Sequence, residues 1–147
     1  MTNHGVQAEV QRAADVLIGA FARSDRDAYF DCFAEDATFL FHTTPGRLDS
    51  RAEYERLWDQ WVVDDGFRVV SCESSFPAVQ VISPAGDTAV FSHRVRTVVE
   101  TRAGRETVAE RETIVFVRDA TQWRAVHEHL SPDPALEAVV DGAIVTE

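Results

Sequence analysis

One carboxylate stands out in the sequence because its neighbours on the same face of a predicted strand are apolar. Glu128 alternates with Val126 and Leu130, and residues two apart in a strand point to the same side of the sheet. An acid among apolar side chains is disfavoured as the anion, so we expect its pKa to rise towards the range that a general acid or base needs. Arg111, on the preceding strand of the same predicted hairpin, is its expected partner. The two would move a proton and stabilise an oxyanion, or would form a structural ion pair.

Aromatic side chains predict apolar walls for such a site. Tyr54 and Trp58 are four residues apart in a segment with helical spacing, and Phe39 and Phe41 alternate in a short β-rich segment. Aromatic residues at these spacings belong first to the core, and in a fold with an internal cavity they line it as well. Together with the apolar neighbours of Glu128, they predict a pocket for an apolar or aromatic small molecule.

Two arginines offer a second kind of contact with a ligand. Arg94 and Arg96 are two positions apart in a predicted strand, so both point one way and could bind an anionic or carbonyl group. The alternative is a solvated edge at which they pair with acids of the neighbouring strand, such as Glu110 or Glu112.

His127 and His129 also share one face, and they could begin a metal site with His93 or His42 as a third ligand. No cysteine or carboxylate stands at a recognisable ligand spacing to them. Hydrogen bonding across the sheet or a place in a subunit interface is therefore the simpler interpretation. The sequence also lacks a Gly-rich phosphate loop and a Cys-x-x-Cys pair, so no cofactor is expected.

Helices and long strands must position these residues. Ser24 is expected to cap the second helix, Ser50 and Glu53 form a capping box for the third, and Pro77 marks a bulge, break or edge in a long strand. We expect helices at 6–21, 26–33 and 51–65, strands at 37–42 and throughout the segment after Gly66, and turns at 83–87, 103–104 and 119–122. Helices that cover one face of an antiparallel meander make an α+β fold, and strands this long must curl around the helices and leave a cone-shaped cavity.

The composition sets limits on the class of protein. The 147 residues include 14 Lys+Arg and 25 Asp+Glu, a net charge of −11, which argues against binding to nucleic acid or to anionic membranes. No apolar run is long enough to span a bilayer, and two cysteines are too few for a disulfide framework. We expect a soluble, cytoplasmic protein with a domain over 1–134 and a tail over 135–147, weakly helical around 135–140.

The element order, the segment EDATF and the C-terminal segments RETIVFVRD and QWRAVHEHLSPDP resemble the nuclear transport factor 2-like superfamily. The similarity is greatest to its SnoaL-like branch, and extends to the association domain of calcium/calmodulin-dependent kinase. The resemblance covers roughly residues 6–134. It implies a SnoaL-like α+β barrel domain, in which a cone-shaped curved antiparallel sheet wraps around three helices and encloses a pocket.

The resemblance also bears on the site residues. The carboxylate that removes a proton in ketosteroid isomerase-like members corresponds to Phe41, and the acid on their penultimate strand to Thr113, so neither acid is carried over. The arginines that hold small carboxylates in the kinase domain correspond to Arg94 or Arg96 and, for the second, to Thr113 or Ile114. The resemblance turns the face of Glu128 into the cavity and the two strand histidines away from it.

Two functions follow from these observations. The first is a cofactor-free isomerase, cyclase or dehydratase, in which Glu128 moves the proton beside Arg111. The alternative is a non-catalytic ligand-binding or oligomerisation domain. A homodimer or larger assembly is expected in both cases, because the helices cover only one sheet face and Trp123, Ile114 and Phe116 would need cover from a second subunit.

Overall fold

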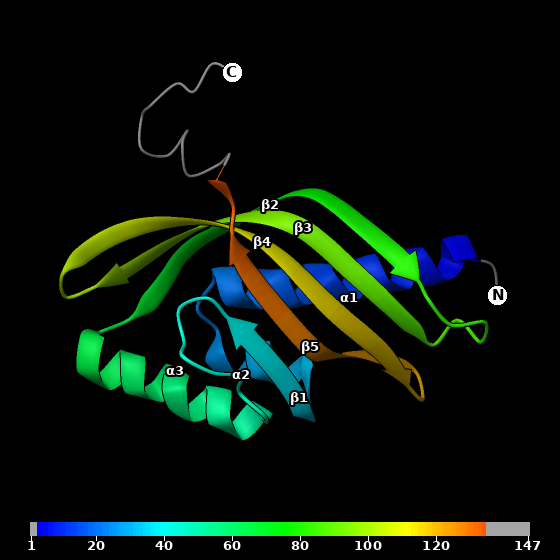
Figure 1. Cartoon of the computed structure of the whole chain (residues 1–147), viewed down its shortest axis with the longest axis horizontal. Helices are drawn as coiled ribbons and strands as arrows, with labels where there is room; N and C mark the ends of the chain where they lie inside the picture. The colour runs from blue at the N-terminus through cyan, green and yellow to red at the C-terminus, as the bar shows by residue number, and fades with distance from the viewer. Residues whose placement is uncertain (1–2, 135–147) are drawn as a thin grey trace, which may run out of the picture.

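The structure, a computed structural model, describes residues 3–134 as three helices and one five-stranded sheet (Figure 1). The predicted tail over 135–147, with its helical tendency, lies outside the described residues. In chain order the elements are α1 (Asn3–Ala22), α2 (Arg26–Asp31), β1 (Phe33–Phe41), α3 (Arg51–Asp65), β2 (Arg68–Val81), β3 (Thr88–Thr101), β4 (Gly104–Asp119) and β5 (Gln122–Pro132).

The helix ends follow from the residues at the caps. The Oγ of Ser50 accepts a hydrogen bond from the backbone N–H of Glu53, and Gly66 closes α3 in the left-handed region at φ 65°, both as predicted. The predicted cap of α2 is wrong by one residue. Asp25 caps that helix, whereas Ser24 turns the chain at φ 56° and accepts a hydrogen bond from the N–H of Val69.

The sheet order is β1-β5-β4-β3-β2, so β1 and β2 form the two edges and the sheet does not close. Strands β2 to β5 form the predicted antiparallel meander, and β1 joins its far side parallel to β5. The long strands curve, and the helices pack on one side of them (Figure 1). The fold is α+β, as expected.

The strand pairing of the described sheet shifts register at four places, and two of these bear on the predictions. The register of β2 shifts between Ser75 and Ala78, where Pro77 predicts an irregularity. The register of β4 and β5 shifts as well, because Val115 pairs with His127 but Phe116 pairs with Ala125. One residue of β5 therefore has no partner. This bulge reverses the alternation of β5 halfway along the strand.

The apolar groups expected to need a partner subunit are covered within the chain. Ile114 and Phe116 are fully buried beneath the helices, and the Trp123 indole N–H donates a hydrogen bond to Glu9 on α1. The expectation that these three residues lie on an uncovered face is wrong, because their side chains are on the helix side of the sheet. The expected homodimer loses this support.

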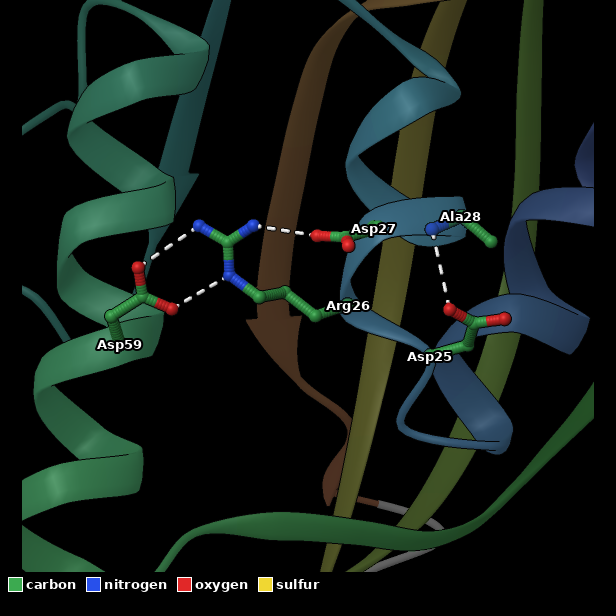
Figure 2. Close-up of polar contacts among 5 residues, drawn as sticks. All are labelled: Asp25, Arg26, Asp27, Ala28 and Asp59. Carbon is green, nitrogen blue, oxygen red and sulfur yellow. Dashed lines mark hydrogen bonds and ion pairs between the residues drawn. The ribbon is translucent and has the colours of Figure 1, made fainter.

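The short helix α2 is tied to α3 by an ion pair. Figure 2 shows the Arg26 guanidinium holding both carboxylate oxygens of Asp59, with N···O distances of 2.6 and 2.9 Å. The same guanidinium lies over the ring of Phe30. This contact fixes α2, which carries one of the polar groups of the site described below.

Within the described residues, no helix combines the length and apolar character needed to cross a membrane.

Candidate functional site

A cavity of about 210 Å³ lies between α1, α3 and the inner face of the sheet. Its walls are mostly apolar and aromatic, as predicted. The lining includes the predicted residues Phe41, Tyr54, Trp58, Glu128 and Leu130. Further aliphatic and aromatic walls come from Leu17, Ile18, Phe21, Trp61, Phe67, Val95, Val99 and Val108.

The carboxyl group of Glu128 marks the inner end of the cavity. Its side chain is 1% exposed, and its Oε1 accepts a hydrogen bond from the Tyr29 hydroxyl at 3.5 Å. The hydroxyls of Tyr29 and Tyr54 are 3.1 Å apart. Helix α2 therefore places one phenol and helix α3 the other beside a carboxyl group from β5. Each of these three residues lines the cavity.

A second carboxyl group, that of Glu112 on β4, lies beside Glu128 and shares a hydrogen bond with it. Glu112 Oε1 is 2.6 Å from His93 Nε2, and the Nδ1 of that imidazole is 2.6 Å from Ser74 Oγ. A line of hydrogen bonds thus crosses four strands, from β2 to β5. Glu112 lines the cavity, whereas His93 contacts Glu112 without lining the cavity.

Burial and charge decide which of these groups ionise. Burial raises the pKa of Glu128 well above its usual value, and the neighbouring charge of Glu112 raises it further. Both effects favour the neutral form of the Glu128 carboxyl group. Burial also raises the pKa of Tyr29 and Tyr54, with a further contribution from Glu128. The inner end of the cavity therefore presents a neutral acid and two phenols.

The outer part of the cavity carries a third glutamate. Glu110 Oε2 is 2.5 Å from His42 Nε2, and exposed Thr43 follows on the same loop. Cys72 also lines the cavity, but burial raises the pKa of its thiol to about 12. A neutral thiol is a poor nucleophile. The sequence contains no lysine that could form a Schiff base.

The predicted pair of Arg111 and Glu128 does not form. Arg111 is exposed on the outer face of β4, opposite Ser131 and Arg94 in the ladders, while its neighbour Glu112 points inward. The prediction is wrong because it placed Arg111 on the cavity side of its strand. The group beside Glu128 is thus a second carboxyl group, that of Glu112, and not a guanidinium.

Two further predictions fail, one through the same alternation and one through the bulge in β5. Arg94 and Arg96 lie on the outer face of β3, where Arg94 Nε is 3.5 Å from Asp133 Oδ2 and its guanidinium lies over Phe76. Neither arginine lines the cavity, so neither can bind a ligand there. Val126, predicted to face the ligand, lies at the β5 bulge, outside the cavity lining.

Phe39 is the last predicted lining residue. It is fully buried, and its ring packs 4.7 Å from that of Tyr54 without forming part of the cavity wall. It supports the lining instead of contacting the cavity.

The four histidines considered as metal ligands do not form one cluster, although the rings of His127 and His129 are 6.4 Å apart. His127 faces outward and its Nδ1 is 2.8 Å from Thr38 Oγ1, whereas His93 and His42 each contact a glutamate near the cavity. Within residues 3–134, no group of three or more His, Cys, Asp or Glu side chains is placed to hold a metal ion.

Sequence reasoning missed Tyr29, Glu112 and His93 as site residues. Glu112 and His93 were considered only as a partner of the strand arginines and as a possible metal ligand. The signal for both was alternation, because each lies one position from an arginine, Arg111 or Arg94, that was predicted to face the ligand. Tyr29 could not be found in this way, since its place depends on how α2 packs against α3.

Comparison with known proteins agrees with this architecture. The chain matches the family model described as SnoaL-like domain over residues 10–135. A nuclear transport factor 2-like superfamily protein from Salmonella enterica superposes with a TM-score of 0.74 at 17% identity, over 89% of this chain and 93% of that one. A candidate calcium/calmodulin-dependent protein kinase II association domain from Xanthomonas campestris gives a TM-score of 0.69 at 20% identity, over 86% of each chain.

A candidate aromatic ring hydroxylase from Novosphingobium aromaticivorans is a further neighbour, with a TM-score of 0.72 at 20% identity over 85% of this chain and 87% of that one. The comparison with curated proteins gave no match. At these identities the structural neighbours share the fold alone. The family match covers most of the chain, so this chain belongs to the SnoaL-like domain family and has the nuclear transport factor 2-like fold.

Proposed function

We propose that the chain is a cofactor-independent acid–base enzyme, an isomerase, cyclase or dehydratase that acts on a largely apolar small molecule in the cavity. The observation that carries the proposal is the carboxyl group of Glu128, buried at the inner end of an apolar cavity beside Glu112. A carboxylic acid kept neutral by its surroundings can donate a hydrogen bond to an oxygen on which charge develops.

The residues suggest a division of roles. A substrate carbonyl oxygen at the inner end would accept hydrogen bonds from Glu128 and from a tyrosine hydroxyl. Glu112 would take a proton from the carbon next to that carbonyl, and the negative charge would move to the oxygen. Return of the proton to another carbon completes an isomerisation. Alternatively, a β-hydroxyl group leaves as water after Glu128 donates a proton to it, which completes a dehydration.

His93 supports Glu112 in this scheme. Its Nε2 contacts the oxygen Oε1 of Glu112 and its Nδ1 contacts Ser74. An imidazole held at both nitrogens orients the carboxyl group that it contacts, in the way that a general base needs to be oriented. His93 is therefore a positioning residue.

A non-catalytic ligand-binding domain is the second candidate. It is favoured by Phe41, which occupies the position on β1 that corresponds to the base of ketosteroid isomerase-like members. In that case the cavity would hold its ligand without transferring a proton. Proton transfer is what separates the two candidates.

Deuterium exchange tests the proposal without a known substrate. The protein is incubated in D₂O with 2-tetralone and with 4-hydroxy-4-phenylbutan-2-one, and exchange and elimination are followed by proton NMR. We expect a rate above background that falls by about 10²–10⁴-fold in Glu128→Gln. The control is Glu73→Gln, an exposed glutamate outside the cavity. Unchanged exchange in Glu128→Gln, or no exchange with either ketone, would contradict an enzyme of this kind.

A further inference from the structure

The acidic side chains of the cavity wall are not balanced by basic ones among the described lining residues. Its lining contains three acids, Glu110, Glu112 and Glu128, and none of the described lining residues is Arg, Lys or His. Two of the acids have imidazole partners, but His42 and His93 contact them without lining the cavity. An incoming ligand therefore meets carboxyl oxygens and no cationic group.

The arginines that could supply a positive charge to the cavity point away from the cavity. Arg94, Arg96 and Arg111 come from the same two strands as the cavity residues, but they lie on the outer face of the sheet. One-residue alternation separates the two faces, so no rotamer of these side chains reaches the cavity through the packed sheet. The separation of charge is a property of the strand register.

This arrangement discriminates between ligands of similar shape. A carboxylate or phosphate that entered would lose its hydration, would face like charge at Glu110 and Glu112, and would find no cation. A neutral carbonyl or hydroxyl loses much less on desolvation. It can accept a hydrogen bond from the Tyr29 or Tyr54 hydroxyl or from Glu128 at the inner end.

We propose that the cavity selects its ligand by charge: it takes a neutral aromatic or alicyclic molecule with a hydrogen-bond acceptor at its inner end, and it rejects carboxylates and phosphates. Glu110 and Glu112 are the residues that determine this selectivity. The inference deepens the proposed function, because it names the substrate class for the same cavity. It concerns binding, so it can fail or hold independently of proton transfer.

The test compares two ligands that differ in little but charge. 2-Acetylnaphthalene is a neutral ketone, and 2-naphthoate is nearly isosteric with it but anionic at neutral pH. Binding is followed through the indole N–H signals of the ¹⁵N-labelled protein. Trp58 and Trp61 line the cavity, whereas Trp123 lies outside it and serves as an internal control.

We expect the ketone to shift the signals of Trp58 and Trp61 and leave that of Trp123 in place. Naphthoate should bind about 100-fold more weakly. Glu112→Gln and Glu110→Gln should each recover about tenfold of the naphthoate affinity, so that the ratio of ketone to naphthoate affinity falls in both variants. Glu73→Gln removes the same charge from an exposed site and should recover none.

Comparable binding of the ketone and naphthoate to the wild-type protein would overturn the inference, and so would no binding of the ketone. Neither result requires a variant to fold. The two glutamine variants then assign the selectivity, and wild-type affinity for naphthoate in both of them would remove Glu110 and Glu112 as its source. An intact charge preference without deuterium exchange would instead contradict the proposed function.

Discussion

Replacing Glu128 with glutamine should stabilise the protein, most strongly at neutral pH. The carboxyl group is buried with a raised pKa. Between the pKa of the unfolded chain, about 4.3, and the higher pKa of the folded state, the folded protein binds more protons than the unfolded one. The free energy of unfolding therefore falls as the pH rises through this window. A glutamine side chain does not titrate, so the Glu128→Gln variant lacks that fall.

The size of the effect follows from linkage. Each pH unit inside the window lowers the wild-type free energy of unfolding by up to about 1.4 kcal/mol. Two such units amount to about 2.7 kcal/mol, or a shift of about 5–10 °C in Tm for a chain of this length. The two proteins should differ least at and below about pH 4.3, where the carboxyl group is protonated in the folded state and at least half protonated in the unfolded state.

Thermal melting of the wild type, Glu128→Gln and the exposed control Glu73→Gln between pH 4.5 and 8 measures this difference. The wild-type Tm should decline relative to Glu128→Gln as the pH rises, and Glu73→Gln should follow the wild type. Parallel curves for the wild type and Glu128→Gln would refute the reasoning, because they would show that Glu128 titrates alike in the folded and unfolded chains. A variant that is more stable and yet inactive would show that stability is given up at this position for function.

Three further predictions follow from individual contacts. Trp58→Ala should lower the free energy of unfolding by about 3–5 kcal/mol in denaturant titrations, because the ring packs against Phe67 at 5.1 Å as well as lining the cavity. A loss below about 1 kcal/mol would mean that Trp58 is not part of the core. Cys72 should resist alkylation by iodoacetamide at pH 8 in the folded protein, since the pKa of its thiol is about 12, and modification at the rate of a free thiol would contradict its burial. A double-mutant cycle on Arg26 and Asp59 should give a coupling of about 0.2–1 kcal/mol, because both side chains are partly exposed, and a value above about 2 kcal/mol would show that the contact is far less screened than its exposure indicates.

The three helices and the antiparallel meander of β2 to β5 could be predicted from local patterns, whereas the pairing of β1 with β5 was not. The cap at Ser50, the glycine that ends α3 and the irregularity at Pro77 all lie where short-range rules place them. The inward orientation of Glu128 was also predicted, since it needs only alternation along one strand and the direction implied by the resemblance.

The predictions that failed concern features that depend on how the strands align with each other and how the helices pack. The side on which Arg111 lies requires the register between β4 and β5, which apolar residues on both faces of these strands leave open. The bulge in β5 moves Val126 out of the lining, and no proline or glycine marks it in the sequence. The tyrosine beside Glu128 comes from a helix nearly a hundred positions earlier in the chain. Such a contact is set by tertiary packing.

The most direct test of the account is the protonation state of Glu128 itself. Carbon-13 NMR of the protein labelled at the glutamate side-chain carboxyl carbons resolves ionised and protonated groups by their chemical shifts. We expect one signal at the position of a protonated acid at pH 7, which is absent from Glu128→Gln and still present in Glu73→Gln. If every glutamate carboxyl group is ionised at pH 7, the cavity holds no neutral acid, and a ligand-binding domain explains the structure better than an acid–base enzyme.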